Sequence, residues 1–218
     1  MNIKPKRVTL FSGHYGSGKT NIAVNYALHL SEMGYKVTIA DLDIVNPYFR
    51  TKDSAEEFER AGIRLISSAY ANSNVDLPAL PAELYALTED KSRYAVLDIG
   101  GDDRGALALG RYAPAILEEG NYENIFVANF YRPLTPNAEA ALEVMREIEL
   151  AGKIPFTAIV HNSNLGEETK AEDILLMNAE AEKLSALAGL PVLFTSADAR
   201  LSNALPDAFH LRLQKKIT

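Results

Sequence analysis

The chain has 218 residues, of which 47% are hydrophobic and 23% are charged, and its net charge is −7. This length suits one α/β domain with a single core, and the composition excludes disordered and fibrous classes. The negative charge argues against a nucleic-acid backbone as partner. The absence of cysteine excludes disulfides, thiolate metal sites and cysteine nucleophiles.

Hydrophobic segments are short throughout the sequence. No window reaches the roughly 18 apolar residues of a membrane span, and residues 1–6 precede no apolar stretch of signal-peptide length. The tail at 211–217 is too short for a membrane helix and favours a frayed or strand-like terminus. We therefore expect a cytoplasmic protein with a single domain over residues 1–218 and no stable membrane contact.

Short apolar runs rich in β-branched residues alternate with helical segments along the chain. Apolar spacing predicts helices over residues 21–33, 136–152 and 171–188, the first two ended by Gly34 and Gly152. The alternation predicts an α/β fold of three layers: a mainly parallel sheet of about seven strands with helices on both faces. The expected strands lie at 7–12, 36–40, 64–68, 94–99, 124–129, 156–160 and 192–195.

A glycine-rich segment separates the first strand from the first helix. Its residues are Gly13, His14, Tyr15, Gly16, Ser17, Gly18, Lys19 and Thr20. This is a full match to G-x-x-x-x-G-K-[ST], whose backbone N–H groups surround phosphate oxygens at the positive end of a helix. Lys19 is expected at the β- and γ-phosphates and the Thr20 hydroxyl at Mg²⁺. The segment therefore predicts a P-loop that binds Mg-ATP.

Carboxylates end two further predicted strands. Asp98 ends the strand at 94–97, as a Walker-B aspartate that organises Mg²⁺ through water would do. Asp41 and Asp43 follow the strand at 37–40 and share one side of the chain. Ligands of open α/β folds bind at this edge of the sheet. A purely structural role in turns is the alternative for all three aspartates.

These motifs resemble the MinD/ParA-type P-loop ATPases, relatives of the nitrogenase iron protein and of the ATP-dependent amidoligases of cobalamin synthesis. The resemblance rests on residues 13–20, Asp41-Leu42-Asp43 and Asp98-Ile99-Gly100-Gly101, and on residues 191–205, which resemble the family's base-binding turn.

Further roles follow from the resemblance alone. It implies that Asp43 positions the attacking water and that Asp41 supports the loop and the metal. It also implies that Asn162 reads adenine, with His161 and Asn164 as alternatives, and that Asp198 lies at the base.

One position departs from the family pattern. Many members carry a lysine directly after the first glycine of the loop, and dimerisation brings it to the partner's nucleotide. This chain has His14 there. The departure puts activation by a lysine in trans in doubt, and leaves His14 either as a weaker donor or as a solvated loop residue.

Three functions remain open at this stage. The leading one is a switch in which ATP binding and hydrolysis to ADP control an unidentified partner, with a possible nucleotide-dependent homodimer. The second is transfer of the γ-phosphate to an anionic small-molecule acceptor, with residues 46–50 and Tyr131-Arg132-Pro133 as acceptor candidates. The third, a GTPase, has no Asn-Lys-x-Asp motif to support it.

Overall fold

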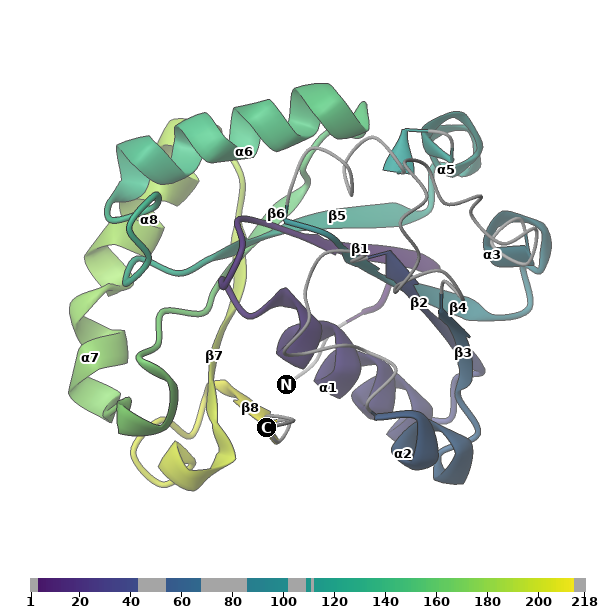
Figure 1. Ribbon diagram of the computed structural model, residues 1–218, viewed down its shortest axis with the longest axis horizontal. Helices are drawn as coiled ribbons and strands as arrows, with labels where there is room; N and C mark the ends of the chain where they lie inside the picture. The colour runs from purple at the N-terminus through teal and green to yellow at the C-terminus, as the bar shows by residue number, and fades with distance from the viewer. Residues whose placement is uncertain (1–3, 43–53, 68–85, 102–108, 111, 214–218) are drawn as a thin grey trace, which may run out of the picture.

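The computed structural model describes residues 4–42, 54–67, 86–101, 109–110 and 112–213. One parallel sheet lies at the centre of this part of the chain, with strand order β3-β2-β4-β1-β5-β6-β7-β8 (Figure 1). The strands are β1 (Val8–Ser12), β2 (Val37–Leu42), β3 (Arg64–Ser67), β4 (Tyr94–Ile99), β5 (Tyr122–Ala128), β6 (Ala158–His161), β7 (Val192–Asp198) and β8 (Phe209–Leu211).

Helices cover both faces of the sheet, as predicted (Figure 1). On one face, α1 and α2 pack over β-strand residues such as Ile39 and Val96. On the other face, α3 and α5 form one hydrophobic cluster and α6 and α8 form another. The helices are α1 (Lys19–Glu32), α2 (Ala55–Arg60), α3 (Ala86–Glu89), α5 (Ala113–Glu119), α6 (Ala138–Gly152), α7 (Ala171–Leu176) and α8 (Asn178–Ala188), with short 3₁₀ turns η3 (Gly166–Glu168) and η4 (Ala199–Leu201).

The seven predicted strands are all present, and an eighth follows them. β8 has only three residues and pairs with the end of β7, where Ser196 aligns with Phe209. The Asn25 side chain on α1 extends this pairing, since its amide donates to the Arg212 carbonyl and its oxygen accepts from the Arg212 amide, at 3.0 and 2.8 Å. Of the tail at 211–217, Leu211 ends β8, while residues 214–218 lie outside the described part, so the frayed or strand-like terminus stays a prediction.

The single helix predicted over residues 171–188 is wrong, because the structure divides it at Met177. In a continuous helix the amide of Met177 would bond to the carbonyl of Asp173. The hydroxyl of Tyr131 takes that carbonyl at 3.0 Å, and the Met177 amide bonds to Ile174 instead. The Tyr131 hydroxyl thus makes a tertiary contact at the break, which helical spacing does not reveal.

Candidate functional site

The P-loop, residues 13–20, connects the carboxyl end of β1 to the first turn of α1. β1 is buried along its whole length, and α1 begins at Lys19 directly after Gly18. Gly18 has φ +92°, in the left-handed region, and a Cβ atom there would lie 2.3 Å from the Asn162 side-chain nitrogen. Both the conformation and the space therefore require glycine at this position.

Polar contacts close the loop on itself. The Lys19 ammonium donates to the His14 carbonyl at 3.2 Å, and the Ser17 amide donates to the same carbonyl at 3.1 Å. The Nδ1 atom of His14 lies 2.9 Å from the Tyr15 carbonyl. Lys19 is buried and the Tyr15 side chain is 48% exposed. The lysine is thus held at the backbone that the motif assigns to phosphates.

Two aspartates lie side by side at the carboxyl edge of the sheet. Asp41 on β2 is in register with Asp98 on β4, and both are buried. Ile39 and Val96, two residues earlier on each strand, pack against α1, so the aspartates face the same side. The buried Thr20 lies in the first turn of α1. Asp43 lies outside the described residues.

This donor set fits a magnesium ion. Two adjacent buried carboxylates repel one another, and a divalent cation offsets the repulsion. Mg²⁺ prefers oxygen ligands and takes one or two protein carboxylates, completing its shell with water and phosphate oxygens. The described residues hold no cluster of three or more His, Cys, Asp or Glu side chains that would form an all-protein cage.

Gly101 lies directly against the P-loop. A Cβ atom at this position would be 2.7 Å from the Tyr15 amide nitrogen, 2.9 Å from the Lys19 ammonium and 3.0 Å from the His14 carbonyl carbon. The segment after β4 therefore approaches the loop so closely that only glycine fits. The sequence motif includes Gly101, but nothing in its spacing reveals this contact.

Asn162 lies behind the P-loop, at the end of β6. Its side-chain nitrogen donates to the Ser17 carbonyl at 2.6 Å, and its side-chain oxygen accepts from the Ser196 hydroxyl at 2.7 Å. Asn162 is 4% exposed and His161 is fully buried. The side-chain amide of Asn164 donates to the backbone carbonyl of Asn162 at 2.8 Å. The role of Asn162 in reading adenine stays a prediction.

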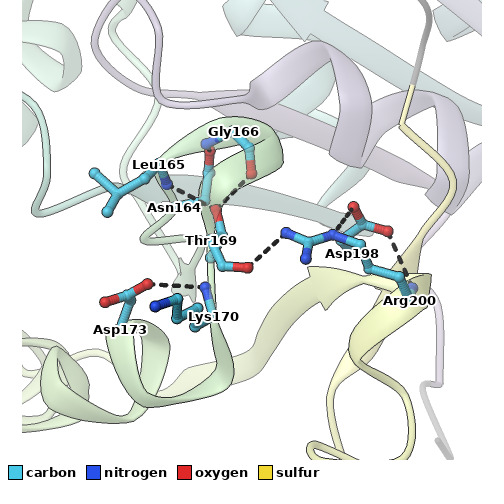
Figure 2. A network of polar contacts seen from close by, with 8 residues as sticks. All are labelled: Asn164, Leu165, Gly166, Thr169, Lys170, Asp173, Asp198 and Arg200. Carbon is cyan, nitrogen blue, oxygen red and sulfur yellow. Dashed lines mark hydrogen bonds and ion pairs between the residues drawn. The ribbon is translucent and has the colours of Figure 1, made fainter.

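A polar network joins the segment after β6 to the turn after β7 (Figure 2). The Asp198 carboxylate accepts from the backbone and the guanidinium of Arg200, at 3.1 and 2.9 Å. The guanidinium also donates to the Thr169 carbonyl at 2.5 Å. Arg200 thus links the two segments that the family resemblance assigns to the base, and the role of Asp198 at the base stays a prediction.

Arg132 is a contact of the P-loop that sequence reasoning missed. It lies in the turn between β5 and α6, and its Nε atom donates to the Gly16 carbonyl at 2.7 Å. Burial lowers the pKa of its guanidinium, which stays charged at neutral pH. Of the two acceptor candidates, this one therefore lies beside the loop, whereas residues 46–50 lie outside the described part.

Comparison with known families agrees with this geometry. Residues 8–169 match the family model described as the CobQ/CobB/MinD/ParA nucleotide binding domain. The chain belongs to this family. The predicted MinD/ParA-type resemblance is confirmed.

A curated relative is the iron-sulfur cluster carrier protein of Aquifex aeolicus (strain VF5), with 30% identity over 98 residues. The match covers 38% of this chain and 27% of the relative, so the chain spans about a quarter of that protein's length.

Solved structures share the fold at low sequence identity. The cell division protein FtsY of Thermotoga maritima matches with a TM-score of 0.59 and 18% identity, over 98% of this chain and 67% of that one. The signal recognition particle 54 kDa protein of Aeropyrum pernix K1, crystallised with GDP, matches at 0.52 and 18%, over 89% and 42%. At this identity the likeness establishes the α/β three-layer P-loop architecture alone.

Within the described ranges, no helix combines the length and the apolar character that a membrane crossing needs.

Proposed function

We propose that this protein is a Mg-ATP-binding P-loop ATPase that acts as a nucleotide-dependent switch on a partner protein. The proposal is carried by one observation: the P-loop, with Lys19 held at its backbone, lies at the same sheet edge as the buried pair Asp41 and Asp98. A cradle of backbone donors beside paired carboxylates suits a nucleotide polyphosphate with its metal ion.

Each residue has a distinct part in this proposal. Loop amides and Lys19 bind the phosphates, and α1 adds the positive end of its dipole. Thr20, Asp41, Asp98 and, by the family resemblance, Asp43 would hold Mg²⁺, directly or through water. When bound, the ion neutralises charge on the phosphate oxygens. Asp43 orients the water that attacks the γ-phosphorus, and ADP and phosphate leave.

Adenine is the proposed base, and guanine is its competitor. The signal recognition particle protein of similar fold was crystallised with GDP. The chain has no Asn-Lys-x-Asp motif, which favours ATP. Direct comparison of the two nucleotides decides between them.

An iron–sulfur carrier function fits this chain poorly. The curated relative bears that name, but the match covers a minority of both chains. Cluster carriers bind iron through thiolates, and this sequence contains no cysteine. We therefore propose that this chain and the carrier protein share the nucleotide-binding module and not the iron–sulfur cargo.

Phosphoryl transfer to an anionic acceptor is the second candidate. Arg132 favours it, because its half-exposed guanidinium lies beside the P-loop and could bind a carboxylate or a phosphate. The two candidates differ in a simple assay. A switch ATPase releases phosphate with ATP alone, whereas a transferase consumes ATP only when its acceptor is supplied.

Asp43→Asn tests the hydrolytic proposal. The substitution keeps the size of the side chain and removes its charge, so Mg-ATP should still bind through the loop. Groups that position or activate a nucleophile contribute about 10² to 10⁴ in rate, and single-turnover hydrolysis should fall by that order.

Glu118→Gln is a control for the loss of one carboxylate, because Glu118 lies exposed on α5. It should hydrolyse ATP as the parent does. Turnover by Asp43→Asn close to the parental rate would leave Asp43 without a catalytic role.

A further inference from the structure

Arg132 is a half-buried cation that no acidic side chain of the described residues neutralises. By contrast, the buried Arg7 forms an ion pair with Glu119. The partner of Arg132 is a backbone oxygen, the Gly16 carbonyl, at 2.7 Å. Burial lowers the pKa of its guanidinium, and no neighbouring carboxylate opposes this effect. Because charges that are removed from water are normally paired, we expect this one to bind an anion from outside the chain.

The bond to Gly16 leaves the end of the guanidinium available. Arginine has five N–H donors, of which Nε carries one. The two terminal nitrogens carry the other four, in a planar fork whose spacing matches the two oxygens of a carboxylate. Neither terminal nitrogen of Arg132 donates to an acceptor within the described part of the chain. Arg132 can therefore bind one oxyanion end-on without releasing the P-loop.

The turn that carries Arg132 is anchored at its base. Asn129 is fully buried, its side-chain oxygen accepts from the Tyr131 amide at 3.0 Å, and its carbonyl accepts from the Thr135 hydroxyl at 2.8 Å. The guanidinium is thus held both by a turn with internal bonds and by its own bond to Gly16. A donor that is fixed before the ligand arrives lowers the entropic cost of binding.

Arg132 and Lys19 lie on opposite sides of the peptide that joins Gly16 to Ser17. In a trans peptide the C=O group and the following N–H group point in opposite directions. The Ser17 N–H group points to the His14 carbonyl, which also accepts from the Lys19 ammonium. The Gly16 carbonyl points the other way, to Arg132. An anion at Arg132 is therefore distinct from the phosphates that Lys19 is proposed to bind.

Exposed apolar side chains flank Arg132. Leu134 lies two residues later in the same turn and is 58% exposed, and Pro133 between them is also exposed. Tyr15, next to Gly16 in the P-loop, is 48% exposed. A ligand that carries an apolar group beside its carboxylate would cover part of this surface. Such a ligand should bind more tightly than a bare carboxylate, because it also removes apolar area from water.

We propose that the Arg132 turn binds a second oxyanion, a carboxylate in preference to a phosphate, beside the P-loop and at the same time as the nucleotide. This inference rests on the proposed nucleotide-binding function and adds a second ligand to it. The carboxylate belongs either to a small molecule or to a side chain of the partner protein. Transfer of phosphate to this ligand is not required. Because Arg132 bonds to the P-loop backbone, the ligand lies where nucleotide occupancy can affect its binding.

Magnetic resonance titration of the ¹⁵N-labelled protein with sodium acetate tests the site. Mg-ADP is bound first so that the phosphate cradle is filled, and sodium chloride at equal ionic strength is the blank. Acetate should shift the Arg132 Nε–Hε signal and the backbone amide signals of Gly16 and Leu134. Arg132→Met should abolish the shifts of these amides. Arg132→Lys, which offers a point charge without a planar fork, should retain weakened binding.

Arg146 provides a matched control, because it lies exposed on α6. Arg146→Met should leave acetate binding at Arg132 unchanged. Acetate should bind at Arg132 about tenfold or more tightly than at Arg146, since a preorganised and partly desolvated fork forms stronger charge-assisted bonds than a solvated one.

A tripeptide distinguishes the two sources of the carboxylate. The acetylated and amidated peptide Leu-Glu-Leu carries apolar groups on both sides of one carboxylate, and Leu-Gln-Leu lacks the charge. If the carboxylate comes from a protein partner, Leu-Glu-Leu should bind about tenfold more tightly than acetate and lose this advantage in Leu134→Ser. If it comes from a small molecule, the peptide should bind no more tightly than acetate. Leu-Gln-Leu should not shift the Arg132 signal in either case.

The outcomes separate this inference from the proposal beneath it. A parent that binds Mg-ADP while acetate and the tripeptide leave the Arg132 signal unmoved overturns the inference alone. Equal affinities for acetate at Arg132 and Arg146 also overturn it, because the turn then adds nothing to an ordinary surface arginine. A parent that does not bind Mg-ADP overturns the proposed function and, with it, simultaneous occupancy of the two sites.

Discussion

His161 is a fully buried histidine at the end of β6, in the connection that leads to Asn162. Its ring lies 6.0 Å from the ring of Phe130, and its Nδ1 atom is 3.5 Å from the Thr195 hydroxyl, too long for a strong hydrogen bond. Burial lowers the pKa of His161 to about 4. The ring is therefore neutral at physiological pH and packs in the core, so it carries no positive charge that could bind a phosphate.

This shift predicts a dependence of stability on pH. Between the unfolded pKa of about 6.5 and the folded value of about 4, the unfolded chain binds a proton at His161 that the folded chain does not. The free energy of unfolding should therefore decrease as the pH is lowered through this window. His161 alone should lower it by roughly 2 kcal/mol between pH 7 and pH 5. Urea unfolding of the parent and of His161→Leu at both pH values measures it.

The difference between the two proteins isolates His161 from the other titrating groups. His161→Leu should lose less stability than the parent on acidification. Equal losses in the two proteins would mean that the ring is protonated in the folded state.

Among the elements of the site, the end of β4 and the P-loop approach one another closely through backbone atoms. Gly101 follows β4, and the atoms nearest to its missing Cβ include the backbone of Tyr15 and His14. Backbone atoms cannot turn aside as the end of a flexible side chain can. A side chain added at Gly101 would therefore displace the backbone of the loop.

Gly101→Ala should weaken nucleotide binding through this contact. A methyl group 2.7 Å from the Tyr15 nitrogen forces the loop and the strand end apart. Overpacking of this kind costs about 1–3 kcal/mol, and we expect Mg-ATP affinity to fall roughly tenfold or more. Calorimetric titration of the variant measures the loss.

Gly34→Ala provides the comparison. Gly34 follows α1 with φ +87° and open space around it, so alanine there strains the backbone without touching the loop. It should lower the melting temperature and leave ATP affinity unchanged. If both variants bind ATP like the parent, the contact of Gly101 with the loop does not affect nucleotide binding.

The sequence predicts elements well where the signal is local. Buried strands such as β1 and β4 are continuous apolar runs, and the Asn137 side chain caps α6 by accepting from the Ala140 amide, as its position suggests. The tertiary features are different. β8 pairs with β7 and is extended by the Asn25 side chain, and the Tyr131 hydroxyl bonds to the carbonyl at the break between α7 and α8.

In the whole molecule, the sequence likewise identifies the local parts of the candidate site but not the parts that tertiary contacts bring together. The P-loop residues follow one another in sequence, so their spacing alone identifies them. Arg132 and Gly16 are 116 positions apart, and Asn162 and Ser17 are 145 apart. No periodicity or motif connects such pairs, because their contact exists only once the parallel sheet has brought the connections after β5 and β6 to one edge.

The parallel sheet also explains why the parts of the site meet. β4, β1, β5 and β6 are neighbours in the sheet, and β2 lies next to β4. Their carboxyl ends carry Asp98, the P-loop, the Arg132 turn, Asn162 and Asp41 in turn. One edge of the sheet therefore gathers the P-loop, the two carboxylates and the side chains of Arg132 and Asn162, at the place where open α/β folds bind ligands.

The most direct test of the central claim is calorimetric titration of the parent and of Lys19→Ala with Mg-ATP, with Mg-GTP in parallel. The parent should bind Mg-ATP more tightly than Mg-GTP. Lys19→Ala removes a charge-assisted bond to the phosphates and should weaken Mg-ATP binding by about ten- to a hundredfold while the protein stays folded. Equal affinity of the two proteins for Mg-ATP, or no binding by the folded parent, would contradict the account.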